Sequence, residues 1–312
     1  MRIVFMGTPD FSVPALESLI NAGHEIVGVV TQPDKPKDRG HEMKFTPVKE
    51  SALKHNIENI YQPEKVKDES FVKILTRLRP DVIVVVAFGQ LLSKDILDVP
   101  IYGCINIHAS LLPKYRGAAP IQWAVIDGEE KSGVTTMYME EGLDTGDMIE
   151  CVEIALEPDE TGGTLHDKLS ILGGNLILTT LEKLENKTAI RIKQDESLST
   201  YAKKLDKKLG KIDFGIPAVN IERLIRGLNP WPSAFTTMNG QNIKIWSSQV
   251  VEEDSNLEIG KVVDIKKNMI VVKTGVHCLG ITSLQLQGKK RMSAEDFLRG
   301  NKLQIGLKLG DD

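Results

Sequence analysis

The sequence predicts a chain of two parts. The first is α/β, a Rossmann-like, mostly parallel sheet with helices on both faces, and the second is a small C-terminal OB-like β-barrel. Residues 2–31 follow a strand–turn–helix–strand pattern, which is how a βαβ unit with parallel strands begins. Residues 81–87 are almost continuously apolar, as in a central strand that is buried on both faces. Beyond residue 229, short strands alternate with turn signals at close spacing, which favours a small barrel.

The composition places the chain among ordinary globular proteins, with 41% hydrophobic and 26% charged residues over 312 positions. Its apolar runs are shorter than the roughly 18 residues that a membrane span needs, and its first residues lack the pattern of a secretory signal. The three cysteines lie far apart without metal-ligand spacing, which suits a reducing compartment. We therefore expect a cytoplasmic monomer with no membrane partner, no disulfides and no metal.

The charge is divided unevenly along the chain. Residues 1–189 carry a net charge of −10 and residues 190–312 a net charge of +6, within a total of −4. A basic segment attached to an acidic body indicates a polyanionic partner that is bound through the basic part.

The first elements follow from local signals. Residues 2–6 and 25–31 are expected as strands, with a helix between them that Ser12 caps and that ends near Gly23. The turn after the first strand is not G-x-G-x-x-G, so we expect no dinucleotide site. Residues 32–48 show no periodicity and carry three prolines, so we expect a long loop there, and the residues allow either a functional loop or an ordinary floppy surface loop.

The remaining elements are expected from periodicity and turn residues. Predicted helices cover residues 46–55, 66–78, 119–127 and 161–186, the last one capped by Thr164, and further α/β strands cover 103–108, 133–139 and 148–155. The barrel strands are predicted at 234–238, 243–250, 260–265, 270–274 and 278–285. We place the α/β domain at 1–189, a linker at 190–208 and the basic barrel domain at 209–312.

One strand stands out because its polar face is chemically unusual. Asn106 and His108 alternate with isoleucines and precede a loop that Ser110, Pro113 and Gly117 interrupt. In open α/β sheets, ligands bind beyond the carboxyl ends of the strands. The residues alone allow two interpretations, a satisfied polar pair at a sheet edge or an active site.

A carboxylate would favour the active site, because a third group usually orients a catalytic imidazole. Asp144 and Asp147 are candidates, since they lie in a glycine-rich loop between two predicted strands. The other histidines are isolated, with no cluster that has the spacing of a metal site.

These motifs resemble the formyltransferases that use 10-formyltetrahydrofolate. The resemblance rests on Asn106-Ile107-His108, on the run from Ser110 to Ile121, and on Leu143-Asp144-Thr145-Gly146-Asp147. It extends over nearly the whole chain through residues 5–11, through 31–34 with the following Arg39-Gly40, and through 226–232. These further stretches are similar to the branch of the family that acts on initiator Met-tRNA. Ala109 and Phe88 differ from the Gly and Tyr that are common in the family.

The resemblance implies a reaction and a set of site residues. A formyl group moves from 10-formyltetrahydrofolate, as co-substrate, to the α-amino group of methionine on initiator tRNA, without a metal. The implied catalytic residues are Asn106, His108 and Asp144. The implied folate-binding residues are Phe88, Ser110, Leu111, Leu112 and Pro113, and we assign tRNA binding to Lys37, Arg39, Lys207 and Lys208.

The chemistry of these side chains agrees with that reaction. Attack of an amine on a formyl carbon gives a tetrahedral oxyanion, to which Asn106 can donate a hydrogen bond, and loss of such a donor costs about 3–4 kcal/mol of barrier. His108 can accept and return a proton near neutral pH, and Asp144 can orient it. The sequence leaves open whether Asn106 or His108 mainly stabilises the oxyanion.

Three other functions remain as alternatives. Formyl transfer to a small amine, as in glycinamide ribonucleotide or amino-sugar formyltransferases, shares the Asn, His and Asp residues, and so does hydrolysis of formyltetrahydrofolate. Neither requires a basic C-terminal domain. A non-catalytic tRNA-binding protein with a relic folate pocket is the third, and the intact polar residues argue against it.

Overall fold

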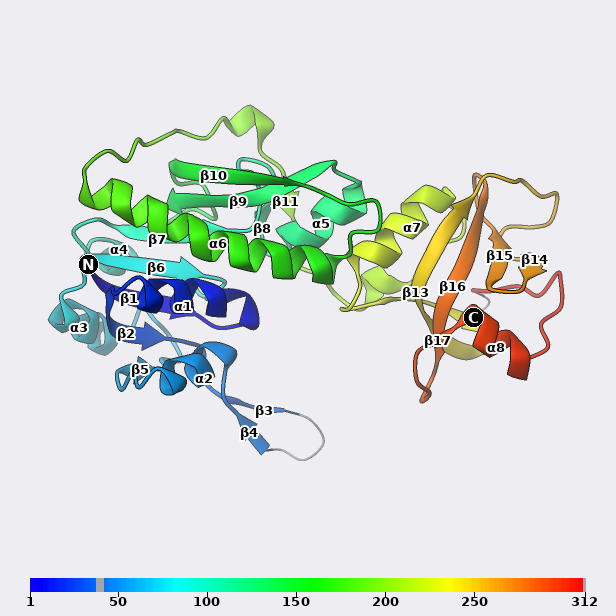
Figure 1. Cartoon of the computed structure of the whole chain (residues 1–312), viewed down its shortest axis with the longest axis horizontal. Coiled ribbons are helices and arrows are strands. Elements are labelled where there is room, and N and C mark those ends of the chain that lie inside the picture. Colours follow the sequence, from blue (N-terminus) through cyan, green and yellow to red (C-terminus); the bar gives the residue numbers. More distant parts are fainter. Residues whose placement is uncertain (38–41, 311–312) are drawn as a thin grey trace. The chain divides into compact units, whose positions relative to one another are not determined.

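The computed structural model describes residues 1–37 and 42–310, which form two compact units (Figure 1). Unit 1 comprises Met1–Pro120, Lys131–Ile154 and His166–Ala202. Unit 2 comprises Ile121–Glu130, Ala155–Leu165 and Lys203–Asp312. The chain is therefore not divided at one point, because two short segments that lie between parts of unit 1 in the sequence belong to unit 2.

A seven-stranded sheet forms the centre of unit 1, in the order β10-β9-β7-β6-β1-β2-β5. Its strands are β1 (Arg2–Gly7), β2 (Glu25–Val30), β5 (Ile60–Tyr61), β6 (Val82–Val86), β7 (Cys104–His108), β9 (Lys131–Tyr138) and β10 (Met148–Ala155). The pairs from β5 to β7 are parallel, and β9 runs antiparallel to β7. This confirms the predicted mostly parallel α/β sheet, and β6 is buried at every residue, as its apolar run indicated.

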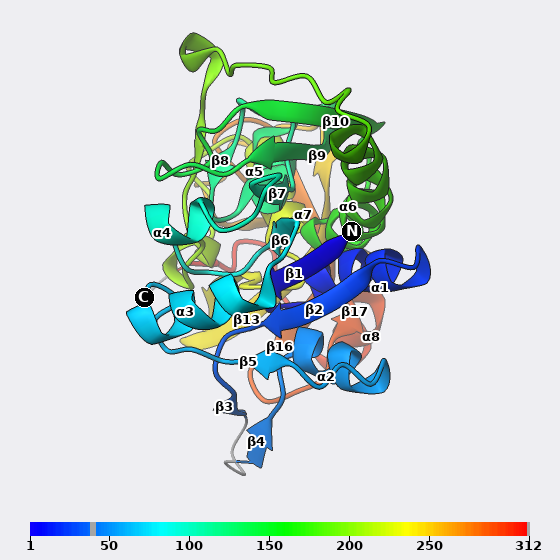
Figure 2. The ribbon, with the colours of Figure 1, turned by 90° about the vertical axis from the view of Figure 1, so that its left-hand side faces the viewer.

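Helices cover both faces of this sheet, as predicted (Figure 2). On one face, α3 (Glu69–Leu78) and α4 (Lys94–Leu97) pack on a cluster of buried side chains that includes Val4 and Val85. On the other face lie α1 (Val13–Asn21) and most of α6 (Gly162–Glu185), where Gly173 lets α6 approach Ile107 of β7 closely. The remaining helix of this unit is α2 (Pro47–Lys54).

Two of the predicted helix caps were wrong in detail. Ser12 precedes α1, but its hydroxyl donates to the Val86 carbonyl oxygen at 2.7 Å instead of capping the helix. The α6 helix begins at Gly162, and the hydroxyl of Thr161 accepts the N–H of Thr164 at 3.1 Å. Thr161 is thus the capping residue, and Thr164 lies inside the first turn.

The expected loop at residues 32–48 contains regular structure. A short antiparallel hairpin pairs β3 (Lys35–Lys37) with β4 (Glu42–Lys44), and α2 then begins at Pro47. Thr46 caps that helix, with its hydroxyl accepting the Lys49 N–H at 3.2 Å. The sequence shows no hydrophobic alternation over these residues, so the hairpin was not predicted. Arg39 lies outside the described residues.

Residues 190–202, which we call the strap, were expected within the linker but pack on unit 1. Ile192 pairs with Met148 through two backbone hydrogen bonds of 2.9 Å. Further along, β11 (Tyr201–Ala202) runs parallel to β8 (Arg116–Gly117). Of the predicted linker, only residues 203–208 fall outside unit 1.

Unit 2 is built on an antiparallel sheet, in the order β12-β13-β16-β15-β14, with β17 paired to β16. Its strands are β12 (Ala234–Met238), β13 (Gln241–Val251), β14 (Val262–Lys266), β15 (Met269–Lys273), β16 (Cys278–Leu286) and β17 (Met292–Ser293). Its helices are α5 (Pro120–Asp127), which starts in unit 1, α7 (Ala218–Gly227) and α8 (Ala294–Gly300). All five predicted barrel strands are confirmed.

The C-terminal segment links the two edge strands of this sheet. Gly310 donates its N–H to Thr237 of β12 at 3.0 Å, and Leu309 donates to Gly260, just before β14, at 2.8 Å. The sheet is thereby closed into a barrel-like unit around a large apolar core that includes Phe297, and Val251, Met269, Val271 and Cys278 form a second, smaller cluster. Across the described residues, every helix is too short or too polar to span a membrane.

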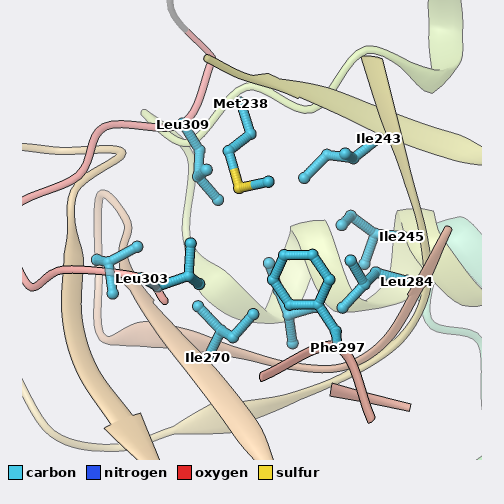
Figure 3. Close-up of a pocket in the computed structure, with 10 residues that line it drawn as sticks. Met238, Ile243, Ile245, Ile270, Leu284, Phe297, Leu303 and Leu309 are labelled. Atoms are coloured by element: carbon cyan, nitrogen blue, oxygen red, sulfur yellow. The ribbon is translucent and has the colours of Figure 1, made fainter. Parts of the chain in front are cut away.

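Figure 3 shows the interior of this unit, where Phe297 points into a ring of aliphatic side chains. The space left between them is about 10 Å³, which is no more than a single water molecule needs. Met238, Ile245 and Leu284 are among the side chains that line it. The space is a packing void of the core and has no room for a ligand.

We predict that Phe297→Ala destabilises the protein by about 3–5 kcal/mol, because it removes a fully buried ring and leaves a cavity. Ile305→Ala is a control in the same unit, since its side chain is 62% exposed. Urea unfolding followed by tryptophan fluorescence measures both changes. Equal midpoints for the two variants would show that the ring does not hold this core together.

Candidate functional site

The carboxyl end of β7 places two polar side chains on one face of the sheet. Asn106 and His108 are only 8% and 6% exposed, and His108 lies opposite Thr135 of β9. Ile105 and Ile107 point to the other face, because successive side chains of a strand alternate. The polar pair therefore lies in a largely enclosed position at the expected edge of the sheet.

The imidazole of His108 is oriented by a backbone carbonyl. Its Nε2 lies 2.9 Å from the Tyr115 oxygen, which can only accept, so Nε2 carries the proton in the neutral ring. Nδ1 is then the nitrogen that can accept a proton. It lies 3.7 Å from Oδ2 of Asp144, which is too long for a hydrogen bond but close enough for an ion pair once an imidazolium forms. The hydrogen bond that orients the ring in this structure is therefore the one to Tyr115, and the role of Asp144 stays a prediction.

Asp144 itself is held in place by backbone groups. Its Oδ2 accepts the N–H of Gly117 at 2.8 Å, and its φ of +54° lies in the left-handed region, which Asp tolerates better than most residues. Gly117 has a φ of +108°, and a Cβ there would lie 2.5 Å from the Tyr201 ring. Glycine is thus required at the residue that binds the carboxylate.

The amide of Asn106 differs from its neighbours in its hydrogen bonding. Within the described ranges of the chain, no hydrogen bond to its side chain is present, although the residue is buried. The side chain is therefore available to bind an oxygen that enters the site.

The loop that follows β7 is rigid, because two hydroxyl groups hold its backbone. Ser110 donates to the Lys114 oxygen at 2.7 Å. Thr135 donates to the Ser110 oxygen at 2.7 Å and accepts the Leu112 N–H at 3.2 Å. Leu112 is buried, while Leu111 and Pro113 are partly exposed. This brings the predicted folate loop directly beside His108, with Thr135 as a supporting residue that the sequence analysis missed.

Phe88 contributes to the site differently from the loop residues. Its ring is 2% exposed and belongs to the core beneath α3 and α4. Its carbonyl oxygen accepts hydrogen bonds from Thr8 at 3.3 Å and from Gln32 at 3.1 Å. The main chain of Phe88, rather than its side chain, therefore connects the ends of β1, β2 and β6.

The strap adds a partly buried polar network that the sequence analysis did not predict. The guanidinium of Arg116 donates to Gln194 Oε1 at 3.0 and 2.8 Å and to both oxygens of Glu196 at 2.9 and 2.8 Å. Gln194 in turn donates its two amide protons to the carbonyl oxygens of Asp144, at 2.9 Å, and Gly146, at 2.8 Å. The bond to Glu196 raises the pKa of Arg116 above its usual value. The strap therefore positions the loop that carries Asp144.

The predicted tRNA-binding residues do not all lie in one unit. Lys37 is on β3 in unit 1, whereas Lys207 and Lys208 belong to unit 2, beside the short helical turn η3 (Lys208–Gly210). At the base of the hairpin, Lys49 bonds to Asp34 and to Gln62. Partial burial opposes ionisation of Asp34, but the bonds from Lys49 and Gln62 outweigh it and lower its pKa.

Two other kinds of chemistry to consider are a reactive cysteine and a metal centre. Burial raises the pKa of the Cys104 thiol to about 12, so it stays protonated and is a poor nucleophile at neutral pH. No group of three or more His, Cys, Asp or Glu side chains within residues 1–37 and 42–310 could hold a metal ion.

Comparison with known families agrees with this arrangement. Residues 1–181 match the formyl transferase family, and residues 204–302 match the formyl transferase C-terminal domain. The chain therefore belongs to the formyltransferase family.

The similarity extends along the whole chain to one kind of family member. The chain is 56% identical to the methionyl-tRNA formyltransferase of Agathobacter rectalis over 306 residues, which is 98% of each protein. It is 51% identical to that of Clostridioides difficile, over 99% of this chain and all of the other. The similarity to these relatives therefore covers both the α/β part and the C-terminal part of this chain.

Solved structures share the fold at lower identity. WlaRD, a sugar 3N-formyltransferase studied with dTDP and 5-N-formyl-THF, aligns with a TM-score of 0.67 and 19% identity over 93% of this chain and 99% of that protein. HypX from Aquifex aeolicus, in complex with tetrahydrofolic acid, aligns with a TM-score of 0.64 and 16% identity over 98% of this chain and 50% of that protein.

We predict that Gln194→Glu lowers the kcat of formyl transfer by about 10- to 100-fold. The carboxylate can still bind Arg116, but it has no protons to donate to the Asp144 and Gly146 carbonyls, and small displacements of a catalytic group are costly. Gln249→Ala, on the exposed surface, is the control. Unchanged kcat in Gln194→Glu would mean that the Asp144 loop holds its position without the strap.

Proposed function

We propose that the chain transfers the formyl group of 10-formyltetrahydrofolate to the α-amino group of methionine on initiator Met-tRNA. The observation that carries the proposal is the convergence of Asn106, His108 and Asp144 beside the loop 110–113. It occurs in a chain that is about half identical to methionyl-tRNA formyltransferases along its full length.

The first step is attack of the amine nitrogen on the formyl carbon. A C–N bond forms, and the carbonyl oxygen becomes an oxyanion. The unpartnered amide of Asn106 supplies a hydrogen-bond donor to that oxygen in an enclosed site, where such a bond is strong.

The second step is proton transfer and departure of the folate. The amine proton passes to Nδ1 of His108, the nitrogen that the Tyr115 carbonyl leaves unprotonated. Asp144, 3.7 Å away, pairs with the imidazolium that results. The same proton then moves to N10 of the folate as the C–N10 bond breaks. No covalent enzyme intermediate is required.

In this proposal, the folate binds against the loop Ser110–Pro113, next to the Phe88 backbone. Because Ser110 and Thr135 fix the loop, it presents the partly exposed Leu111 and Pro113 in one conformation. Binding to a pre-formed surface avoids the entropic cost of ordering it.

The tRNA is bound in part by Lys207 and Lys208, which are exposed, with Lys37 and Arg39 contributing from the hairpin segment. The catalytic domain that we propose extends to Ala202 instead of residue 189, because the strap carries Gln194. The C-terminal domain binds tRNA through phosphate contacts. The monomeric state and the cytoplasmic location remain predictions.

The decisive assay incubates the full chain with 10-formyltetrahydrofolate and aminoacylated initiator tRNA and detects formylmethionyl-tRNA. Parallel reactions contain glycinamide ribonucleotide, an amino sugar nucleotide, or no acceptor. Product with the small amines alone would assign the chain to the first alternative, and folate turnover without an acceptor would assign it to the hydrolases. Binding of tRNA with no turnover would favour the non-catalytic alternative.

We predict that Asn106→Ala, His108→Ala and Asp144→Ala each reduce kcat by about 100-fold or more. The three residues act on one transition state, so double variants should lose much less than the product of the single losses. Circular dichroism and the thermal midpoint check that the fold is intact. A single variant with near wild-type kcat would remove that residue from the proposed mechanism.

A further inference from the structure

Tyr201 lies at the end of the strap, on a backbone that is held on both sides. The Arg116 N–H donates to the Thr200 oxygen at 2.9 Å, and the Ala118 N–H donates to the Ala202 oxygen at 3.0 Å. These bonds belong to the pairing of β11 with β8 (Figure 1). Ala202 is fully buried, whereas the side chain of Tyr201 is 60% exposed. The strap therefore presents an aromatic ring to the solvent in a fixed position.

One edge of this ring rests on the backbone of Gly117. The Cε2 and Cδ2 atoms of Tyr201 lie 2.5 and 3.0 Å from the place that a Cβ of residue 117 would occupy. The N–H of the same glycine donates to Oδ2 of Asp144 at 2.8 Å, and this oxygen lies 3.7 Å from Nδ1 of His108. The backbone of a single residue thus joins the exposed ring to the carboxylate that faces His108.

The surface around Tyr201 is apolar and uncharged. Within residues 1–37 and 42–310, no hydrogen bond to the Tyr201 hydroxyl is present, so the structure makes use of the ring alone. Residues 197–202 carry no charge, whereas Lys203 and Lys204 follow directly. An uncharged aromatic surface suits the flat face of a nucleobase, which stacks on such rings, better than it suits a phosphate.

The acceptor of the proposed reaction carries a base close to the amine that reacts. Methionine is esterified to the ribose of the 3′-terminal adenosine of its tRNA, so one ester group and one ribose separate the α-amino group from the adenine. When the amine is at Nδ1 of His108, the adenine must lie a short distance away on the surface of the same unit. Tyr201 lies across Asp144 and Gly117 from that nitrogen, which is a separation of the same order.

We propose that the ring of Tyr201 stacks on the adenine of the 3′-terminal nucleotide of the Met-tRNA substrate. Because β8 and Gly117 hold the ring before the substrate binds, stacking costs little conformational entropy. The stacked base then places the methionyl ester beside Asn106 and His108. This inference rests on the proposed function and adds a residue that recognises the acceptor end of the substrate.

The test combines a change in the protein with a change in the substrate. Tyr201→Leu keeps an apolar side chain over Gly117 but removes the aromatic face. In the substrate, an abasic ribose that carries the methionine replaces the terminal adenosine of Met-tRNA. Each change alone should lower kcat/KM for formylation about tenfold, because either one removes the stacked pair. The two changes together should cost little more than one of them, since the second has no remaining partner to remove.

Two further variants serve as controls. Tyr201→Phe keeps the ring and should stay within about twofold of the wild-type kcat/KM, because the hydroxyl has no partner in the protein. Ile190→Ala removes a side chain that is 72% exposed at the other end of the strap, and it should leave kcat/KM unchanged with both substrates. Thermal midpoints close to that of the wild type are required of every variant.

A fluorescent base reports stacking without any need for turnover. Met-tRNA with 2-aminopurine in place of the terminal adenine should lose fluorescence when it binds to the wild-type chain or to Tyr201→Phe, because stacking on an aromatic ring quenches this base. Bound to Tyr201→Leu, it should keep most of its fluorescence. This measurement on the wild type and Tyr201→Phe also remains valid if Tyr201→Leu is unstable.

The outcomes separate this inference from the proposed function. If the two changes together cost the product of the single losses, Tyr201 acts on Asp144 through Gly117 without touching the base, and the inference is overturned. The absence of quenching with the wild type, or equal quenching with the wild type and Tyr201→Leu, would overturn it as well. If the wild type quenches the terminal base but transfers no formyl group to tRNA, the proposed function fails and the stacking site stands.

Discussion

The candidate site depends on how the strap holds the residues that orient His108 and Asp144. Tyr115, whose carbonyl fixes the His108 ring, has a φ of +60° and donates its N–H to the Thr200 hydroxyl at 2.8 Å. The next residue, Arg116, donates its N–H to the Thr200 oxygen at 2.9 Å. Gln194 of the same segment binds the backbone of the Asp144 loop. One segment of 13 residues (190–202) thus fixes both the proton acceptor and its acidic partner, which explains why it belongs to unit 1.

The sequence predicted the elements in which hydrophobic residues form a continuous run or alternate regularly with polar ones. The apolar run of β6, the alternation along β7 and the short strands of unit 2 all reflect which side chains face the core. The hairpin β3–β4 and the strap were missed for a common reason. Neither segment has a hydrophobic pattern: the backbones of β3 and β4 pair with each other, and the strap is held by backbone hydrogen bonds and by polar side chains such as Gln194. Ser12 does not cap α1 because its hydroxyl bonds to β6, a contact that is distant in the sequence, whereas the cap of α6 is a local bond to Thr161, three residues before Thr164.

The residues of the candidate site divide in the same way, into those that a sequence pattern reveals and those that only the folded chain reveals. Asn106, His108 and Asp144 could be identified because an alternating strand and a glycine-rich loop present them, and because the motifs resemble a known family. The sequence could not identify Thr135, Arg116 and Gln194, because they act through hydrogen bonds to residues that are 23 to 78 positions away. Arg116 lies within the quoted motif, but only the structure shows that it faces Gln194. Supporting residues of this kind become visible when the elements are assembled.

The central claim is that the Tyr115 carbonyl keeps the proton on Nε2 of His108, so that Nδ1 is free to accept one from the substrate. Nitrogen-15 NMR of the full chain, with the His108 signals assigned by comparison with His108→Asn, measures this tautomer directly. At a pH where the ring is neutral, we predict a protonated Nε2 with a nitrogen-15 shift of the pyrrole type and an Nδ1 of the pyridine type. The opposite pattern, with the proton on Nδ1, would contradict the account, because the only nitrogen able to accept a proton would then face a backbone carbonyl.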